Sequence, residues 1–190
     1  MQPGDVVVTI ISGNSLWDKI RRACVGKYSH CFLYMGVMRL GATKYRACAG
    51  KIPMIFESTG CGVCLRLLSE RYGQEVLVMR LSKYRRRIPR LLREAIKLAS
   101  DEKSYYDYFC IAKYIIPRII WEKLHLPLDK MPLSWHRDPR QICSEALLEI
   151  HLRAMIPVLP DDILPLPGDF VTDSDLLKKE ECGKLSEEWI

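Results

Sequence analysis

The first half of the chain is built from short apolar runs separated by turn residues, a pattern typical of β-strands. Such runs occur over residues 6–11, 30–36, 53–57, 63–68 and 75–81. Strand side chains alternate between the two faces of a sheet. The run 30–36 therefore divides into two sets, one for each face: His30, Phe32 and Tyr34, and Cys31, Leu33 and Met35.

The second half repeats apolar residues every three or four positions, which indicates amphipathic helices. Pro89 stands in the first turn of one helix, and a second helix, after Ser104, should kink at Pro117. A third helix begins at Cys143, and Ser15 is suited to cap a short one. Strands followed by helices predict an α+β fold, with a small antiparallel sheet packed against helices.

The remaining stretches read as connections and a tail. Residues 37–51 are basic and rich in small residues, and residues 122–141 hold three prolines with little periodicity. Residues 156–170 are rich in proline and should run extended over the surface. A length of 190 residues suits a single domain, which we place at residues 1–177. We expect residues 178–190 to form a charged C-terminal tail that frays.

Charge narrows the function only slightly. Lysine and arginine number 29 against 23 aspartates and glutamates, a net charge of +6 that favours anionic surfaces without indicating a nucleic-acid-binding protein. Basic residues gather between positions 80 and 93, but no aromatic platform for stacking bases accompanies them. We therefore expect no specific nucleic-acid partner, and contact with an anionic surface through Arg85, Arg86 and Arg87.

The eight cysteines are irregularly spaced, and no secretory signal opens the sequence. The longest apolar run, 6–11, is far too short to cross a bilayer, so a cytoplasmic protein with reduced thiols is expected, unless a signal has been removed. Cys61 and Cys64 have the spacing of a metal knuckle or redox pair. A zinc site needs two more ligands, for which Cys31 and Cys48 are unconvincing, so we predict no metal or other cofactor.

Cys143 is the candidate with the clearest chemistry. At the start of a helix, unpaired N–H groups and the positive end of the helix dipole favour an anion, and a thiolate is one. A catalytic thiolate also needs an imidazole and a group that orients it. His30 opens a strand after a turn, and Glu57 ends a strand beside Gly60. If these strands are neighbours, both side chains can lie on one face.

Plainer interpretations stand beside this one. Cys143 could be an inert buried thiol, and Glu57 a solvated carboxylate at a strand end. His30 could be a structural histidine at a sheet edge, and His136 is a rival base because it is closer to Cys143 in the sequence. The two other histidines are expected at the surface: His125 and His151.

Several short motifs together resemble the circularly permuted papain-like amidases of the YiiX/YaeF type, in the NlpC-like thiol peptidase superfamily. They are Gly4-Asp5-Val6-Val7, Ser29-His30 with Tyr34-Met35-Gly36, Glu57-Ser58-Thr59, Tyr106-Asp107, Cys143-Ser144-Glu145 and Pro167-Gly168-Asp169-Phe170. Each motif is weak alone, but the order His, Glu, Cys is specific, because ordinary papain-like enzymes place the cysteine first. The resemblance spans roughly residues 3–177, and the stretches 37–51 and 122–141 depart from it.

The resemblance implies a permuted papain-like fold with Cys143 as nucleophile, His30 as base and Glu57 as the orienting residue. It places Tyr106 near the cleft, in contact with substrate or oxyanion. The implied activity is a cysteine peptidase or amidase that acts on a short peptide, a peptidoglycan stem peptide or an N-acyl amide. A lipid-acting thiol acyltransferase or thioesterase, and a binding module without activity, remain alternatives.

Overall fold

The computed structural model describes residues 1–16, 18–19, 22, 26–39, 51–101, 116–126, 141–161 and 164–190. Six strands form one sheet in the order β4-β3-β2-β1-β5-β6, and every neighbouring pair is antiparallel. Their bounds are β1 Val6–Ile10, β2 Tyr28–Arg39, β3 Lys51–Thr59, β4 Gly62–Leu67, β5 Glu75–Leu81 and β6 Leu177–Lys184. The five apolar runs of the first half are thus the first five strands.

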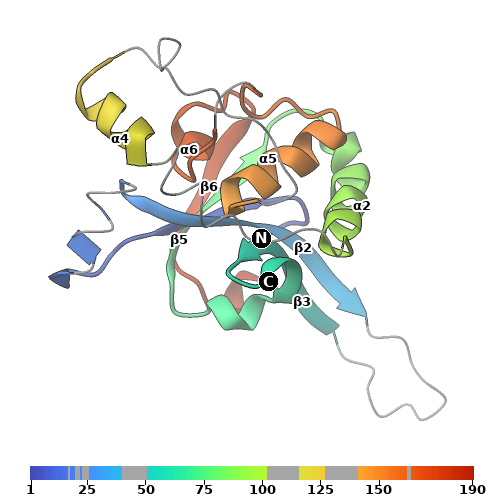
Figure 1. Ribbon diagram of the computed structural model, residues 1–190. Helices are drawn as coiled ribbons and strands as arrows, with labels where there is room; N and C mark the ends of the chain where they lie inside the picture. Colours follow the sequence, from blue (N-terminus) through green and yellow to red (C-terminus); the bar gives the residue numbers. More distant parts are fainter. Residues whose placement is uncertain are drawn as a thin grey trace.

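Four α-helices lie in the described ranges: α2 Ile88–Ala99, α4 Ile116–Lys123, α5 Cys143–Arg153 and α6 Asp169–Thr172. Three short 3₁₀ helices accompany them: Leu68–Arg71, Arg85–Arg87 and Glu187–Trp189. Figure 1 shows α2, α5 and α6 on one side of the sheet. The α+β fold expected from the sequence is therefore confirmed.

Each face of the sheet has its own apolar core. Cys31, Leu33 and Met35 of β2 pack with α2 and α5 in the larger core. Phe32 and Tyr34 belong to the smaller core on the other face, where Leu68 and Trp189 of two 3₁₀ helices also pack. The predicted alternation along β2 is confirmed, and it places neighbouring residues on opposite faces.

The chain end is ordered where fraying was expected. Leu177–Lys184 forms β6 and pairs with β5 over its length, although most of its side chains are exposed. Its residues are mostly charged, as is common in edge strands, where charge discourages pairing with other molecules. The expectation of a frayed tail from Lys178 was wrong because it relied on apolar periodicity, which an exposed edge strand need not show.

Two other expectations fall partly on residues that the structure does not describe. Pro117 lies in the first turn of α4, and the rest of the helix predicted after Ser104 lies outside the described residues. Most of the stretch 122–141 lies outside them too. Among the described helices, none combines the length and apolar character needed to span a membrane.

Candidate active site

Cys143 is the first residue of α5, and the backbone around it is anchored on both sides. The Ser58 hydroxyl of β3 donates to the carbonyl of Gln141 at 2.6 Å, and the Ser144 hydroxyl donates to the carbonyl of Pro165 at 2.6 Å. Both serines are buried. Buried hydrogen bonds of this kind fix the position of the backbone, so the nucleophile candidate has a defined place against the sheet.

The helix start is also stabilised from within. The Ile142 N–H donates to the Glu145 carboxylate at 2.8 Å, which satisfies one donor that precedes the helix. The first backbone N–H groups of α5 have no partner inside the helix, as at every helix start. They leave a positive field at Cys143, the position predicted from the sequence for an anion.

His30 and Glu57 lie on adjacent strands and point to the same face. His30 Nε2 and Glu57 Oε2 are 2.8 Å apart, and Glu57 is only 1% exposed. The paired residues of β2 and β3 begin at Leu33 and Phe56, so His30 and Glu57 lie just beyond the end of that ladder. The structure therefore brings together the two side chains that were predicted to lie on neighbouring strands.

Cys143 contacts the same imidazole. Its thiol is within hydrogen-bonding reach of His30, and Glu57 occupies Nε2, which leaves Nδ1 for the sulfur. Burial lowers the pKa of His30, but the Cys143 thiolate and the Glu57 carboxylate raise it to about 9. The three residues predicted from the sequence thus form one connected chain, sulfur to imidazole to carboxylate.

Cys31 is a second contact of the Cys143 sulfur, although sequence analysis considered it only as an unconvincing zinc ligand. The pKa of Cys143 lies well below its ordinary value, although burial raises it. The largest cause is a hydrogen bond with the Cys31 thiol, and the charge of His30 lowers this pKa further. Burial and the neighbouring Cys143 raise the pKa of Cys31 well above its ordinary value. These opposite directions favour Cys143, and not Cys31, as the thiolate of the pair.

Two arginines, in addition to His30, lie against the Glu57 carboxylate. Arg71 Nη2 donates to Glu57 Oε2 at 2.5 Å, and Arg66 Nε lies 3.7 Å from Oε1. Burial raises the pKa of Glu57, but the contacts with His30 and Arg71 outweigh it and lower that pKa. Glu57 is thus held ionised in the interior. Arg66 was within reach of sequence reasoning, because the tight turn before β4 sets it diagonally opposite Glu57; no sequence signal marked Arg71.

Some predicted residues are elsewhere, or outside the described ranges. Tyr106, His136 and Cys48 lie outside the residues that the structure describes. His125 is exposed, as expected, but His151 is fully buried, which corrects its assignment to the surface. Its ring sits on α5 with Nδ1 2.7 Å from the Leu147 carbonyl, so the backbone partly satisfies it.

Cys61 lies in the turn between β3 and β4, and Cys64 lies in β4. Cys61 is exposed and Cys64 is partly buried, and both are free thiols. No three His, Cys, Asp or Glu side chains within the described ranges are grouped so that they could hold a metal ion. Within those ranges, the metal-knuckle interpretation of this spacing gains no support.

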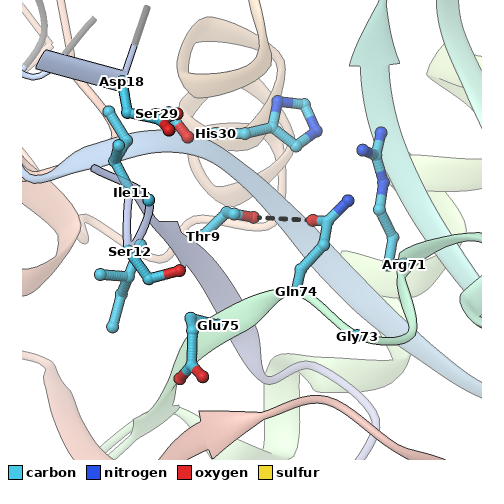
Figure 2. A pocket seen from close by; sticks show the side chains of 12 residues that line it. Thr9, Ile11, Ser12, Asp18, Ser29, His30, Arg71, Gly73, Gln74 and Glu75 are labelled. Atoms are coloured by element: carbon cyan, nitrogen blue, oxygen red, sulfur yellow. Dashed lines mark hydrogen bonds between the residues drawn. The ribbon is translucent and has the colours of Figure 1, made fainter. Parts of the chain in front are cut away.

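A polar pocket of about 280 Å³ opens beside His30. Figure 2 shows Thr9 and Gln74 in its middle, joined by a 3.4 Å hydrogen bond, with His30 and Asp18 on one side and Glu75 on the other. Arg71 also lines it. The pocket is therefore suited to a polar group that lies next to the imidazole.

Comparison with known proteins supports the fold. No protein-family model matches the sequence, and no curated protein matches it significantly. Among solved structures, the chain resembles the crystal structure of the metalloprotein YiiX from Escherichia coli O157:H7, with a TM-score of 0.55. The likeness covers 97% of this chain and 98% of that chain at 17% sequence identity. The fold is of the YiiX type, as the motifs predicted, and at this identity the likeness concerns the fold alone.

Proposed function

We propose that this protein is a cysteine hydrolase that cleaves an amide bond through a covalent acyl-enzyme on Cys143. The observation that carries the proposal is the position of His30, whose imidazole contacts the Cys143 sulfur on one side and the buried Glu57 carboxylate on the other. A thiol, an imidazole and an orienting carboxylate in this sequence of contacts are the groups that acyl transfer needs.

The pKa values favour a thiolate–imidazolium pair as the resting state. The pKa of Cys143 lies well below its ordinary value, and that of His30 is raised to about 9, so the proton resides on His30 at neutral pH. The thiolate attacks the substrate carbonyl carbon, and the carbonyl electron pair moves onto oxygen. The N–H groups in the first turn of α5 are positioned to stabilise that oxyanion.

Breakdown of this intermediate needs an acid, which His30 provides. The C–N bond breaks as the imidazolium transfers its proton to the leaving amine, and a thioester on Cys143 remains. The acylated sulfur has no charge, so one of the two groups that raise the pKa of His30 is removed. The neutral imidazole then accepts a proton from water, the hydroxide attacks the thioester, and the acid product leaves as the thiolate–imidazolium pair is restored.

Glu57 has a supporting role in this scheme. It fixes the orientation of the ring through Nε2 and stabilises the imidazolium, while Arg71 and Arg66 keep the carboxylate ionised although it is buried. A polar pocket lies beside His30 and is also lined by Arg71, so a polar part of the substrate can approach the ring from that side. We expect peptide-like amides, including peptidoglycan stem peptides and N-acyl amides, to be the substrates, with Tyr106 at the cleft.

YiiX is described as a metalloprotein, which raises the question of a metal here. Within the described ranges no group of three or more potential ligands is placed for one, and His30 Nε2 is already bound to Glu57. Two arginines beside Glu57 also disfavour a cation at that carboxylate. The described residues do not fit a metal site, so we derive no step through a metal. Because Cys143 and His30 make and break the bonds, hydrolysis should persist in EDTA.

A lipid substrate is the second candidate. Ile120 of helix α4 and Leu124, just after the helix, are 54% and 62% accessible and offer apolar surface to an acyl chain or a membrane. The same thiolate chemistry would then transfer or hydrolyse an acyl group from an ester or thioester. The contacts of His30 do not distinguish an amide from an ester, so a substrate comparison is required.

The test combines thiol labelling with a substrate panel. Limited alkylation with iodoacetamide at about pH 5.5, mapped by mass spectrometry, should modify Cys143 first, since its pKa is lowered well below the ordinary value and a thiolate is the reactive form. The panel compares peptide amides, a stem peptide, an N-acyl amide and an acyl ester, using wild type, Cys143→Ala and the exposed-thiol control Cys61→Ala. Turnover that is lost only in Cys143→Ala supports the proposal. Preferential labelling of Cys61 or Cys64, or turnover that survives in Cys143→Ala, contradicts it.

A further inference from the structure

The Cys143 sulfur contacts two consecutive residues of β2 that point to opposite faces of the sheet. His30 lies on the face of Glu57, and Cys31 lies on the face covered by α5. A single atom can contact both only if it lies near the plane of the sheet. The α5 start must therefore insert the sulfur beside the edge of β2, and not simply rest above the sheet.

The sheet provides room for this insertion at one place. The β2–β3 ladder ends at Leu33 and Phe56, so the edge of β2 that carries Cys31 is not closed by β3. Continued register would place Ser58 opposite Cys31, but the Ser58 hydroxyl binds the Gln141 carbonyl, two residues before Cys143. The α5 start thus occupies the place where a strand-to-strand pairing would have continued.

Cys31 offers the sulfur two donors there. Its backbone N–H and its side-chain S–H are both within hydrogen-bonding reach of the Cys143 sulfur. Cys31 is fully buried, so water does not compete for its S–H. A buried donor needs an acceptor, and a hydrogen bond to a charged acceptor such as a thiolate is stronger than one to a neutral group. A serine or alanine would fill the space less well, but only the serine would keep a donor.

We propose that Cys31 is a positioning residue, whose thiol donates a hydrogen bond to the Cys143 thiolate and holds it in the opening between β2 and β3. This inference rests on the proposed function, because it assumes that Cys143 acts as a thiolate. Cys31 itself makes no bond to substrate. Its role is to keep the nucleophile ionised and aligned with His30.

Other charged groups near the pair do not replace this donor. His30 supplies a positive charge from β2, and Glu57 of β3 acts through His30. Asp169 of α6, whose carboxyl lies 3.0 Å from Arg118, contributes negative charge that favours the thiol form of Cys31. Loss of the Cys31 thiol should therefore weaken the thiolate even when His30 and Glu57 are unchanged.

The test is the pH dependence of alkylation at Cys143, measured in the full chain by mass spectrometry for wild type, Cys31→Ala, Cys31→Ser and the control Cys64→Ala. Cys31→Ala should move the midpoint of Cys143 labelling to higher pH. Well below the midpoint, the labelling rate should fall about tenfold for every tenfold decrease in the acid dissociation constant of the Cys143 thiol. Labelling well above the midpoint should be nearly unchanged. Cys31→Ser should bring the midpoint back toward that of wild type, because its hydroxyl keeps the donor, and Cys64→Ala should match wild type.

These outcomes separate a hydrogen bond from packing, and the inference from the proposed function. Equal changes of the midpoint in Cys31→Ala and Cys31→Ser, or no change in either, overturn the role of the thiol as donor. Thermal melting followed by circular dichroism identifies a variant that fails to fold. If Cys31→Ala does not fold, the labelling midpoint of Cys31→Ser alone is compared with that of wild type. If Cys143 labels at low pH but no amide or ester is hydrolysed, the proposed function fails while the Cys31 contact stands. An ordinary labelling midpoint for wild-type Cys143 overturns both.

Discussion

Helix α5 has an imidazole at each end, and the two rings are under opposite electrostatic control. At its start, His30 contacts the Cys143 thiolate and Glu57, and its pKa is raised to about 9. In its last turn, His151 is fully buried, and burial lowers its pKa to about 4 although the Leu147 carbonyl raises it. Burial acts in the same direction on both rings, so the charged partners alone make the difference.

The comparison separates a histidine that is equipped for proton transfer from one that is part of the core. His30 is 19% exposed in its side chain and lies at the polar pocket, so the ring is accessible from outside the core. His151 Nε2 has no hydrogen-bond partner among the described residues, and the polar pocket does not reach it. A buried imidazole therefore indicates function here only when anionic groups surround it.

The largest effect should come from removing the His30 ring. In the proposed mechanism one imidazole both protonates the leaving amine and activates water, so His30→Ala should reduce kcat by on the order of 10⁵-fold, approaching the loss in Cys143→Ala. His151→Gln should retain turnover within a few-fold. Steady-state kinetics on both variants, with circular dichroism to confirm folding, tests the contrast.

His136 provides the decisive control for this assignment. If His136→Ala abolishes turnover while His30→Ala preserves it, the imidazole has been misassigned. The thiolate–imidazole–carboxylate scheme would then lose its central member. Equal, large losses in His151→Gln and His30→Ala, with both variants folded, would remove the distinction between the two histidines.

A smaller loss is expected from Glu57→Gln, which keeps the shape of the side chain but removes its charge. We expect kcat to fall by roughly 10²- to 10⁴-fold, less than for His30→Ala, because the nucleophile and imidazole remain. Loss of the carboxylate also removes one group that raises the pKa of His30. The limb of the kcat/KM profile at high pH should therefore move to lower pH, and an unchanged limb would contradict this role.

The His30 side of the comparison was largely predictable from the sequence. Strand alternation separated His30 from Cys31, and the helix period placed Cys143 at the start of α5; both are confirmed. The end of the β2–β3 ladder was not predictable, because it depends on contacts between distant segments. Without it, Cys31 looked like an ordinary core cysteine, although it lies against the sulfur of Cys143.

Two regions that sequence analysis misassigned share one physical feature, polar residues in positions where composition suggests solvent. His151 was assigned to the surface, but its ring satisfies one nitrogen on the Leu147 carbonyl of its own helix and is covered by the core. The charged segment from Lys178 was expected to fray, but its backbone pairs with β5. In both cases backbone hydrogen bonds, which side-chain patterns do not reveal, offset the cost of order.

Acid should reveal the His151 side of the comparison as a loss of stability. The pKa of His151 is about 4 in the folded protein, against an ordinary value of 6.5, so the unfolded chain binds more protons between these values. Stability supplied by the neutral ring is complete above about pH 6.5 and is lost as the pH falls through 4. The total is roughly 3 kcal/mol at the acid end, because a tenfold change in proton affinity corresponds to about 1.36 kcal/mol.

Urea unfolding at pH 7 and pH 4.5 measures this effect. Wild type should lose more stability on acidification than His151→Gln, which cannot take up the proton, and the exposed-residue control His125→Gln should follow wild type. The thiolate–imidazolium pair also makes stability depend on pH, but only below about pH 6.5. Between pH 6.5 and 9 the pair binds one proton, the same number as the cysteine and histidine of the unfolded chain. Equal acid sensitivity in wild type and His151→Gln would show that His151 does not contribute.

The smallest effect is expected from removing arginines that have no anionic partner in the described part of the chain. They contrast with Arg71, which is paired with Glu57. Arg85 and Arg86 are exposed at the approach to α2, and neither forms an ion pair with any described residue. Arg85 donates to the Leu81 carbonyl, at 3.3 Å, whereas Arg87 donates to the Met155 carbonyl and also packs over the Tyr84 ring. We expect the first two to contact an anionic surface, so the double variant Arg85→Ala/Arg86→Ala leaves Arg87 in place.

This double variant should change stability by no more than about 0.5 kcal/mol, as is usual for exposed positions, and leave turnover of a small soluble substrate unchanged. Its binding to vesicles that contain phosphatidylserine should fall, by about 1 kcal/mol for each arginine that reaches the surface. The matched control Lys97→Ala/Arg153→Ala removes two charges that are already paired with Glu94 and Glu149. Cosedimentation at low and high salt compares the variants. An equal loss in both would reduce the effect to net charge, and unchanged binding in the first would show that these unpaired arginines are simply solvated.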